Sequence, residues 1–136
     1  MGSRRKGRES ALQILYQIDT SGTSGEQALA LYFAHLSSSE EGEEFATELV
    51  RLFDRDHDRI DGLIRDVSHH WRLKRMTRVD RNILRLRVTV LLHCPDVPRR
   101  VTLNEAVELA KRFGSEGSAG FVNGVLDRVA TDLGKE

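Results

Sequence analysis

Residues 102–127 restrict the fold most strongly, because two helical apolar patterns flank a glycine-containing turn. Thr102, with Glu105 three residues later, predicts a capped helix start. Gly114 predicts the end of that helix, and Ser118 predicts the cap of a second, strongly apolar helix. This second helix offers few polar side chains to the base edges of DNA, so the pair predicts part of a helical core rather than a DNA-reading motif.

Helical spacing of apolar residues also runs through the rest of the chain. Apolar side chains three and four positions apart occur in residues 9–19, 28–36, 45–53, 60–71 and 79–91. No proline precedes Pro95, and polar breaks separate these segments. The spacing predicts an all-α fold of about seven helices without an internal repeat.

Two further predicted helices, earlier in the chain, also begin with capping signals. Ser24 and Gln27 have the spacing of a capping box. Thr77 precedes another helix and places Asp80 in its first turn, where a carboxylate favours the helix dipole. We therefore expect helices to begin close to residues 25 and 78.

One segment carries two conflicting patterns. Residues 84–90 alternate between apolar and polar side chains, as a half-buried strand does, whereas the wider window 79–91 has helical spacing. A strand needs a partner, and no second credible strand is evident. The sequence predicts a helix that ends near His93, because Pro95 disfavours helical backbone at the residue before it.

Composition excludes several classes of protein. Lysines and arginines balance aspartates and glutamates at 21 each, so nucleic-acid binding would need a local patch. Cys94 is the only cysteine, which excludes an intramolecular disulfide and predicts a structural thiol. No signal peptide or membrane-spanning run is evident, so we expect a cytoplasmic protein without membrane contact.

Motifs for catalysis, cofactors and metals are not evident. Residues 54–58 place acidic side chains at alternate positions, but a calcium loop needs Gly sixth and Glu twelfth, where this chain has Arg59 and Arg65. The adjacent pair His69 and His70 points in different directions on a helix and is poorly placed to share a metal. The glycine-rich turn lacks the ending of a phosphate-binding loop. The sequence predicts a non-enzymatic protein without cofactor or metal.

A basic segment opens the chain, with Arg4, Arg5, Lys6 and Arg8 around Gly7. Such a cluster is suited to contact an anionic polymer, but a run this short is more typical of a solvated, disordered terminus. Gly7 weakens a helical extension back to the basic residues. The residues alone leave both interpretations open.

Five ordered segments resemble the NusB family of transcription antitermination factors. They are residues 5–16 (RKGRESALQILY), 79–85 (VDRNILR), 95–98 (PDVP), 104–114 (NEAVELAKRFG) and 121–127 (FVNGVLD). The resemblance covers nearly the whole chain. It implies one NusB-like domain over 1–136, with two small helical bundles at about 4–71 and 77–133.

The resemblance also implies a function. NusB proteins bind the boxA element of nascent ribosomal RNA transcripts as a single strand, together with NusE, a ribosomal protein. Their complex joins other Nus factors on RNA polymerase and suppresses premature termination. The resemblance leaves open whether the chain forms a homodimer.

Particular residues match functional positions of the family. The resemblance implies RNA contacts by Arg4, Arg5, Lys6 and Arg8, and it matches Tyr16 to a tyrosine near the RNA and partner surface. That side chain could stack on a base, although a tyrosine at helical spacing is also typical of a core.

The partner surface follows from the same resemblance. Asp80 matches an acidic position used towards NusE, and Lys74 in the preceding connector is expected nearby. Asp80 is equally explained as a first-turn carboxylate that favours the helix dipole.

The chain departs from the family pattern at two places. Thr89 and Val90 stand where members commonly carry Tyr-Glu, which leaves one helix surface and any partner contact there open. Gly117 stands where an acidic residue is usual. Loss of that negative charge near the RNA face predicts modestly stronger RNA binding.

Three alternatives stay open at the level of sequence. A general ribosomal-RNA-binding or assembly module would share the fold without antitermination. The fold also occurs as a domain of RNA cytosine methyltransferases, although we expect no room for a catalytic domain in 136 residues. A protein-interaction scaffold would leave the basic segment merely solvated.

Overall fold

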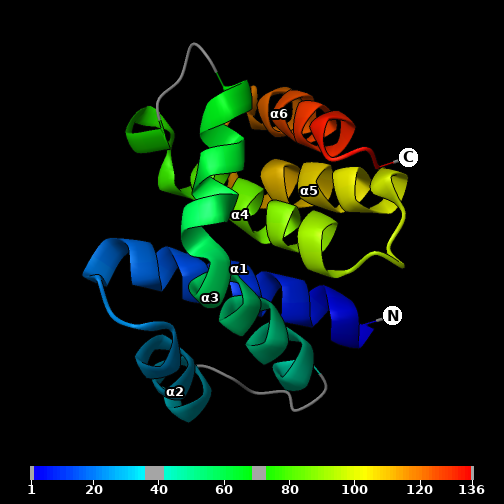
Figure 1. The fold of residues 1–136 in the computed structure, drawn as a ribbon. Helices are drawn as coiled ribbons and strands as arrows, with labels where there is room; N and C mark the ends of the chain where they lie inside the picture. The colour runs from blue at the N-terminus through cyan, green and yellow to red at the C-terminus, as the bar shows by residue number, and fades with distance from the viewer. Residues whose placement is uncertain (1, 36–41, 69–72, 136) are drawn as a thin grey trace. The chain divides into compact units, whose positions relative to one another are not determined.

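A computed structural model describes residues 2–35, 42–68 and 73–135 and places helices without strands among them (Figure 1). The helices are α1 (Gly2–Ser21), α2 (Gly25–His35), α3 (Glu43–Val67), the short 3₁₀ helix η1 (Leu73–Arg75), α4 (Arg78–His93), α5 (Arg99–Phe113) and α6 (Ser118–Asp132). These elements confirm the predicted all-α fold. The histidines of residues 69–70 lie outside the described residues.

The chain packs as two compact units, Met1–Arg55 and Asp56–Glu136. The first contains α1, α2 and the beginning of α3, and the second contains the remainder. The division into functional bundles at about 4–71 and 77–133 stays a prediction.

In the first unit, α1 continues through Gly7 and begins at Gly2. Gly7 is buried, and a Cβ there would lie 2.8 Å from Phe45 Cδ2 and 3.0 Å from the Gly42 carbonyl oxygen. The glycine that weakens the isolated helix therefore permits close packing against α3. Packing outweighs the low helix propensity, and the basic segment is helical.

The α2 helix begins with the predicted capping box. Gln27 N–H donates to Ser24 Oγ at 3.2 Å, and Ser24 N–H donates to Gln27 Oε1 at 3.3 Å. Each bond satisfies an amide that the helix end leaves without an intrahelical partner. The core of this unit consists of Ala11, Leu12, Ile14, Leu15, Ala28, Leu29, Ala46, Leu49, Val50 and Phe53.

A break in helical geometry interrupts α3 at Asp56, where φ is −119° and ψ is 21°. The helical segment predicted around residues 45–53 and the described part of the one predicted at 60–71, up to Val67, thus belong to one helix with a kink. His93 Nε2 lies 3.0 Å from Asp56 Oδ2, so the kinked residue contacts the end of α4.

In the second unit, α4 buries residues around most of its circumference. Leu84, Leu86, Val88 and Val90 are all buried, and so are Ile83 and Leu91. The alternation that resembled a strand is explained by a helix enclosed on several sides. Thr77 Oγ1 accepts the Asp80 N–H at 3.1 Å, which confirms the predicted cap of α4.

The predicted start of α5 is wrong. The helix begins at Arg99 with Pro98 at the N-cap, so Thr102 lies inside it and is fully buried. Its Oγ1 makes no hydrogen bond to the part of the chain that the structure describes. Pro98 has its φ preset and begins the helix one turn earlier than the capping-box pattern predicts. Glu105 Oε1 instead accepts from Arg87 Nη1 at 2.6 Å.

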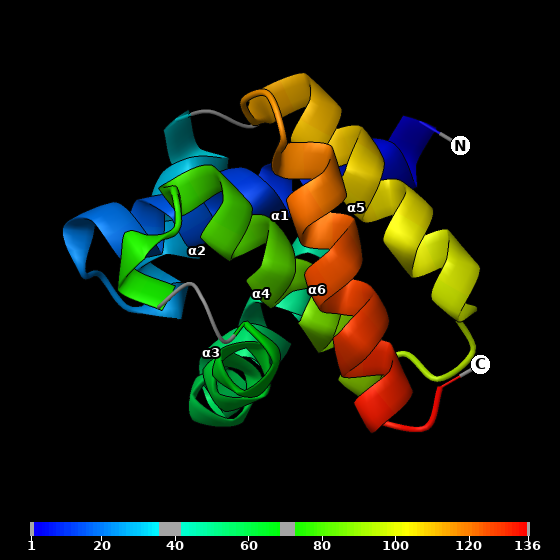
Figure 2. The same cartoon turned by 90° about the horizontal axis from the view of Figure 1, so that it is seen from above.

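The start of α6 also differs from the prediction. Gly117 is its N-cap residue, with a left-handed φ of 90°. Ser118 is the first helical residue, and its Oγ accepts the Ser115 N–H at 3.0 Å within the turn. Figure 2 shows α6 packed beside α4 and α5, and the three helices contact one another pairwise.

Candidate nucleic-acid and partner interfaces

The outer face of α1 brings together three of the predicted RNA-binding residues. Arg5, Lys6 and Tyr16 are exposed, whereas Ile14 and Leu15 on the opposite side are buried. Arg5 and Tyr16 are separated by about three helical turns, so they lie on the same side, roughly 16 Å apart along the axis. Two cations and one aromatic ring thus share a solvent-facing surface.

Tyr16 is 41% exposed, so the structure does not place it in the core. Its ring is available for stacking on a base, a contact typical of single-stranded RNA recognition. Arg5 Nε lies 3.8 Å from Glu9 Oε2 one turn along the helix. Such an exposed pair is weak, and Arg5 can exchange it for a phosphate.

The other two cations of the segment lie differently. Arg8 is half-buried and already interacts within the chain. The backbone of Arg4 belongs to α1, but its side chain is outside the described part of the structure. Among the cations with described side chains, Arg5 and Lys6 are therefore the more accessible to phosphates.

Gly117 lies in the exposed turn between α5 and α6. A Cβ at this position would meet no atom within 4 Å, but the positive φ strains any side-chain-bearing residue. The guanidinium carbon of Arg112, close by in sequence, lies 5.3 Å from the centroid of the Phe113 ring. Phe113 is 37% exposed, so this turn presents a cation and a ring to solvent.

The predicted partner residues lie at η1 and at the start of α4. Lys74 is exposed, whereas Asp80 is only 8% exposed. Asp80 Oδ1 is buried and makes no hydrogen bond to the described residues. A partner could reach Asp80 only through the small exposed part of the residue.

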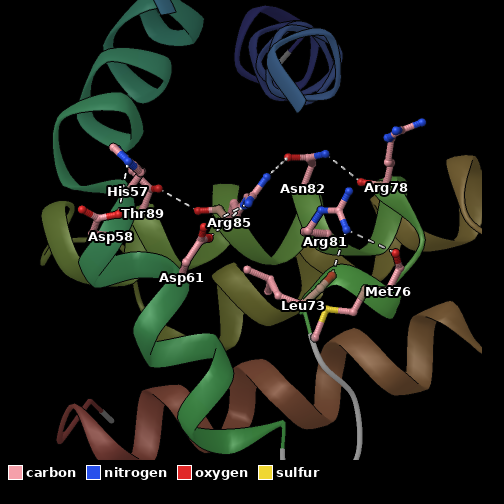
Figure 3. Close-up of polar contacts among 10 residues, drawn as sticks. All are labelled: His57, Asp58, Asp61, Leu73, Met76, Arg78, Arg81, Asn82, Arg85 and Thr89. Atoms are coloured by element: carbon pink, nitrogen blue, oxygen red, sulfur yellow. Dashed lines mark hydrogen bonds and ion pairs between the residues drawn. The ribbon is translucent and has the colours of Figure 1, made fainter. Parts of the chain in front are cut away.

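Arg81 holds η1 against α4. Its Nη1 donates to the Leu73 carbonyl at 2.8 Å and lies 3.4 Å from the Met76 carbonyl (Figure 3). The arginine thereby fixes the segment that carries Lys74. The sequence did not identify this role, since both acceptors are backbone atoms.

A second polar cluster links α3 and α4. Arg85 Nε and Nη2 donate to the two carboxylate oxygens of Asp61, each at 2.9 Å, and Nη1 donates to Asn82 Oδ1 at 3.2 Å (Figure 3). Arg85 and Asp61 are each 15% exposed. This ion pair stabilises the packing of α3 against α4. Asp61 and Arg85 are far apart in the sequence, so no sequence pattern predicts their contact.

Thr89 and Val90, the two residues of α4 that depart from the family pattern, are both buried. Thr89 is fully buried, and its Oγ1 donates to the Arg85 carbonyl at 2.7 Å. Val90 is 3% exposed. In this chain, these positions contribute to packing rather than to an accessible surface.

The described residues form neither a metal site nor a membrane span. Among the described residues, no group of three or more histidine, cysteine, aspartate or glutamate side chains could hold a metal ion. Across the same residues, no helix has the length and apolar character needed to cross a membrane.

Comparisons with known proteins agree with the fold. A sequence model described as the NusB family matches residues 5–131. The transcription antitermination protein NusB of Sorangium cellulosum is 49% identical over 135 residues, covering 99% of this chain and 96% of the relative. These matches confirm the family resemblance.

Two solved structures extend the comparison. NusB of T. maritima superposes with a TM-score of 0.85 at 35% identity, covering 95% of this chain and 91% of that chain. A crystal structure of the antitermination factors NusB and NusE in complex with double-stranded RNA gives a TM-score of 0.82 at 28% identity. That match covers 97% of this chain and 98% of the other.

Proposed function

Because this chain belongs to the NusB family, we propose that it is a transcription antitermination factor that binds boxA RNA of nascent ribosomal RNA together with NusE. The single observation that supports this most is the nearly full-length similarity to a curated antitermination protein. The proposal gives the chain a binding role rather than a catalytic one. It acts in the cytoplasm, within a complex of other Nus factors and RNA polymerase.

RNA contacts the outer face of α1 in this proposal. The exposed Arg5 and Lys6 supply the main phosphate contacts, Arg4 and the half-buried Arg8 of the same segment add positive charge, and the exposed Tyr16 ring stacks on a base. For single strands, each phosphate contact contributes roughly −0.7 to the slope of log affinity against log salt. A face with several contacts therefore binds RNA with strong salt dependence.

NusE contacts the second unit around η1 and the start of α4. The exposed Lys74 forms the accessible part of this contact, and the nearly buried Asp80 contributes at its edge. Arg81 holds both segments together. Binding measurements with the variant Lys74→Ala test this contact. The substitution should weaken NusE binding and leave RNA binding by the free chain unchanged.

The decisive experiment measures the Kd for single-stranded boxA RNA, a scrambled RNA and a duplex, each with and without NusE. Wild type should prefer boxA RNA, and NusE should tighten that binding. The variant Arg4→Ala/Arg5→Ala/Lys6→Ala should bind boxA RNA roughly 100-fold more weakly at 0.1 M salt, with a salt slope lower by about two.

A charge-matched control separates local contacts from total charge. The variant Arg55→Ala/Arg65→Ala/Arg128→Ala removes three exposed cations from α3 and α6 and should bind RNA nearly as wild type does. Equal affinity for boxA and scrambled RNA, unaffected by NusE, would refute the antitermination proposal. Preference for the duplex would favour a general ribosomal-RNA module, and no RNA binding would favour a protein scaffold.

A further inference from the structure

A groove of about 470 Å³ lies in the second unit, against the beginning of α5 and one face of α6. The two helices lie side by side (Figure 2). The groove is lined by Pro98, Arg99, Arg100, Leu103, Asn104 and Asn123. None of these residues belongs to the RNA or NusE contacts proposed above.

One wall of the groove is held in place by Arg99. Its Nη2 donates to Asp127 Oδ1 at 2.6 Å and to Thr131 Oγ1 at 2.8 Å, and its Nη1 donates to the Lys135 carbonyl at 3.0 Å. These bonds fasten the start of α5 to the end of α6. Arg99 is therefore a structural residue, with its charge balanced by Asp127.

The remaining polar groups of the groove are available to a ligand. Arg100, Asn104 and Asn123 are exposed, and their side chains make no hydrogen bond or ion pair with another residue in the described part of the chain. The lining contains no carboxylate, so Arg100 gives the groove a positive charge. Asparagine is also a poor helix former, so two asparagines on neighbouring exposed helix surfaces are not explained by helix stability.

This chemistry matches a nucleotide. A phosphate complements the Arg100 guanidinium, and the apolar side chain of Leu103 can pack against the face of a base. Each asparagine amide offers a donor and an acceptor together, which is the pattern that pairs with the N6 and N7 edge of adenine. The small size of the groove limits the occupant to one or two nucleotides.

We propose that this groove binds a nucleotide of single-stranded RNA, with Asn104 and Asn123 contacting the base edge and Arg100 contacting the phosphate. The inference rests on the proposed RNA-binding function and adds a base-reading contact on the second unit. It assigns this groove sequence discrimination, whereas the α1 face supplies mainly charge.

NMR of the side-chain amides tests the proposal directly. The protein labelled with ¹⁵N is titrated with boxA RNA, with a short oligoadenylate and with an abasic ribose-phosphate oligomer of equal length. The amide signals of Asn104 and Asn123 should shift with oligoadenylate and with boxA RNA, but little with the abasic oligomer. The buried Asn82 supplies an internal reference signal.

Variants then test the individual contacts. Asn104→Ala/Asn123→Ala should bind oligoadenylate roughly tenfold more weakly than wild type and the abasic oligomer equally well. Arg100→Ala should weaken both and lower the salt slope by about 0.7, whereas the matched control Arg128→Ala should change neither.

The outcomes separate this inference from the proposed function. If boxA RNA binds while both asparagine signals and all groove variants behave as wild type, the groove assignment is overturned. If oligoadenylate shifts the signals but boxA RNA is not preferred to scrambled RNA, the groove assignment stands and the antitermination proposal fails. If NusE alone moves the signals and RNA does not, the groove is a protein contact and the inference is wrong.

Discussion

An ion pair joins neighbouring helices in each unit, but the two pairs lie in different surroundings. In the first unit, Arg51 donates to both oxygens of Glu26 at 2.8 and 2.9 Å, with side chains 56% and 64% exposed. In the second, Arg87 contacts Glu105 at 2.6 Å, with side chains 1% and 21% exposed. Loss of one partner should therefore have different consequences in the two pairs, because water replaces a lost partner at the surface but not around a buried guanidinium.

Glu105→Ala should produce the largest loss of stability. Removal of this carboxylate takes the 2.6 Å ion-pair contact away from the buried Arg87 guanidinium, at a cost of about 3 kcal/mol in the free energy of unfolding. Urea unfolding followed by circular dichroism measures the change. The matched first-unit variant Glu26→Ala should have a much smaller effect.

A double variant separates pairing from packing in this comparison. Arg87→Met/Glu105→Leu should recover most of the lost stability, since it removes both charges and keeps the volume apolar. Equal losses for Glu105→Ala and Glu26→Ala would show that burial does not distinguish the two pairs.

The helix caps should contribute equally to stability in the two units, in contrast to the ion pairs. Ser24→Ala and Thr77→Ala each remove an oxygen that accepts a first-turn amide, and each should lower stability by about 1 kcal/mol. Thermal melts of the two variants provide the test. A loss confined to one unit would mean that the other cap contributes little to its helix.

Thr102→Val should act in the opposite direction. The Thr102 hydroxyl is buried without a hydrogen bond in the described part of the chain, so its replacement by a methyl group should stabilise the protein by up to about 1 kcal/mol. Calorimetry can resolve this gain. Destabilisation by Thr102→Val would indicate that the hydroxyl has a partner, and Thr102→Ser should be destabilising because it leaves a cavity.

Gly117 extends the comparison from stability to binding. Gly117→Asp should weaken boxA RNA binding roughly threefold relative to Gly117→Asn, since the two side chains share size and backbone strain but differ in charge. Fluorescence anisotropy measures the ratio. Tighter binding by the aspartate variant would contradict a position close to RNA.

The smallest effect concerns pH in the first unit. The hydrogen bond from Arg51, aided by its charge, lowers the pKa of Glu26 below its ordinary value. A lowered pKa in the folded state adds stability above the unfolded-state pKa, and this contribution is lost as the pH falls through the folded-state pKa. The difference in unfolding free energy between wild type and Glu26→Gln should therefore shrink on acidification. A difference that grows towards low pH would contradict a lowered pKa of Glu26.

Local sequence signals predicted the fold where the deciding interactions were local. Ser24 and Thr77 both cap helices as expected, because each bond spans three residues. Thr102 carries the same local signal, but Pro98 begins that helix one turn earlier and tertiary packing buries the threonine. Gly7 likewise sits inside α1 because of Phe45, a contact that local propensity does not include.

The candidate site was predictable in part. The cations of the basic segment and Tyr16 were identified by family resemblance, and their distribution on the α1 surface required the structure. Arg85 with Asp61 and the groove at Asn104 and Asn123 join residues distant in sequence. No spacing rule predicts such pairs, because they depend on how helices pack.

The close approach of Gly7 to Phe45 also bears on the entropy of RNA binding. A flexible basic tail must give up conformational freedom for every phosphate that it contacts. Here Arg5 and Lys6 extend from a helix that the Gly7 contact fastens to the core, so their backbone is ordered before RNA arrives. The α1 face is thus preorganised, and more of its electrostatic attraction remains as net affinity.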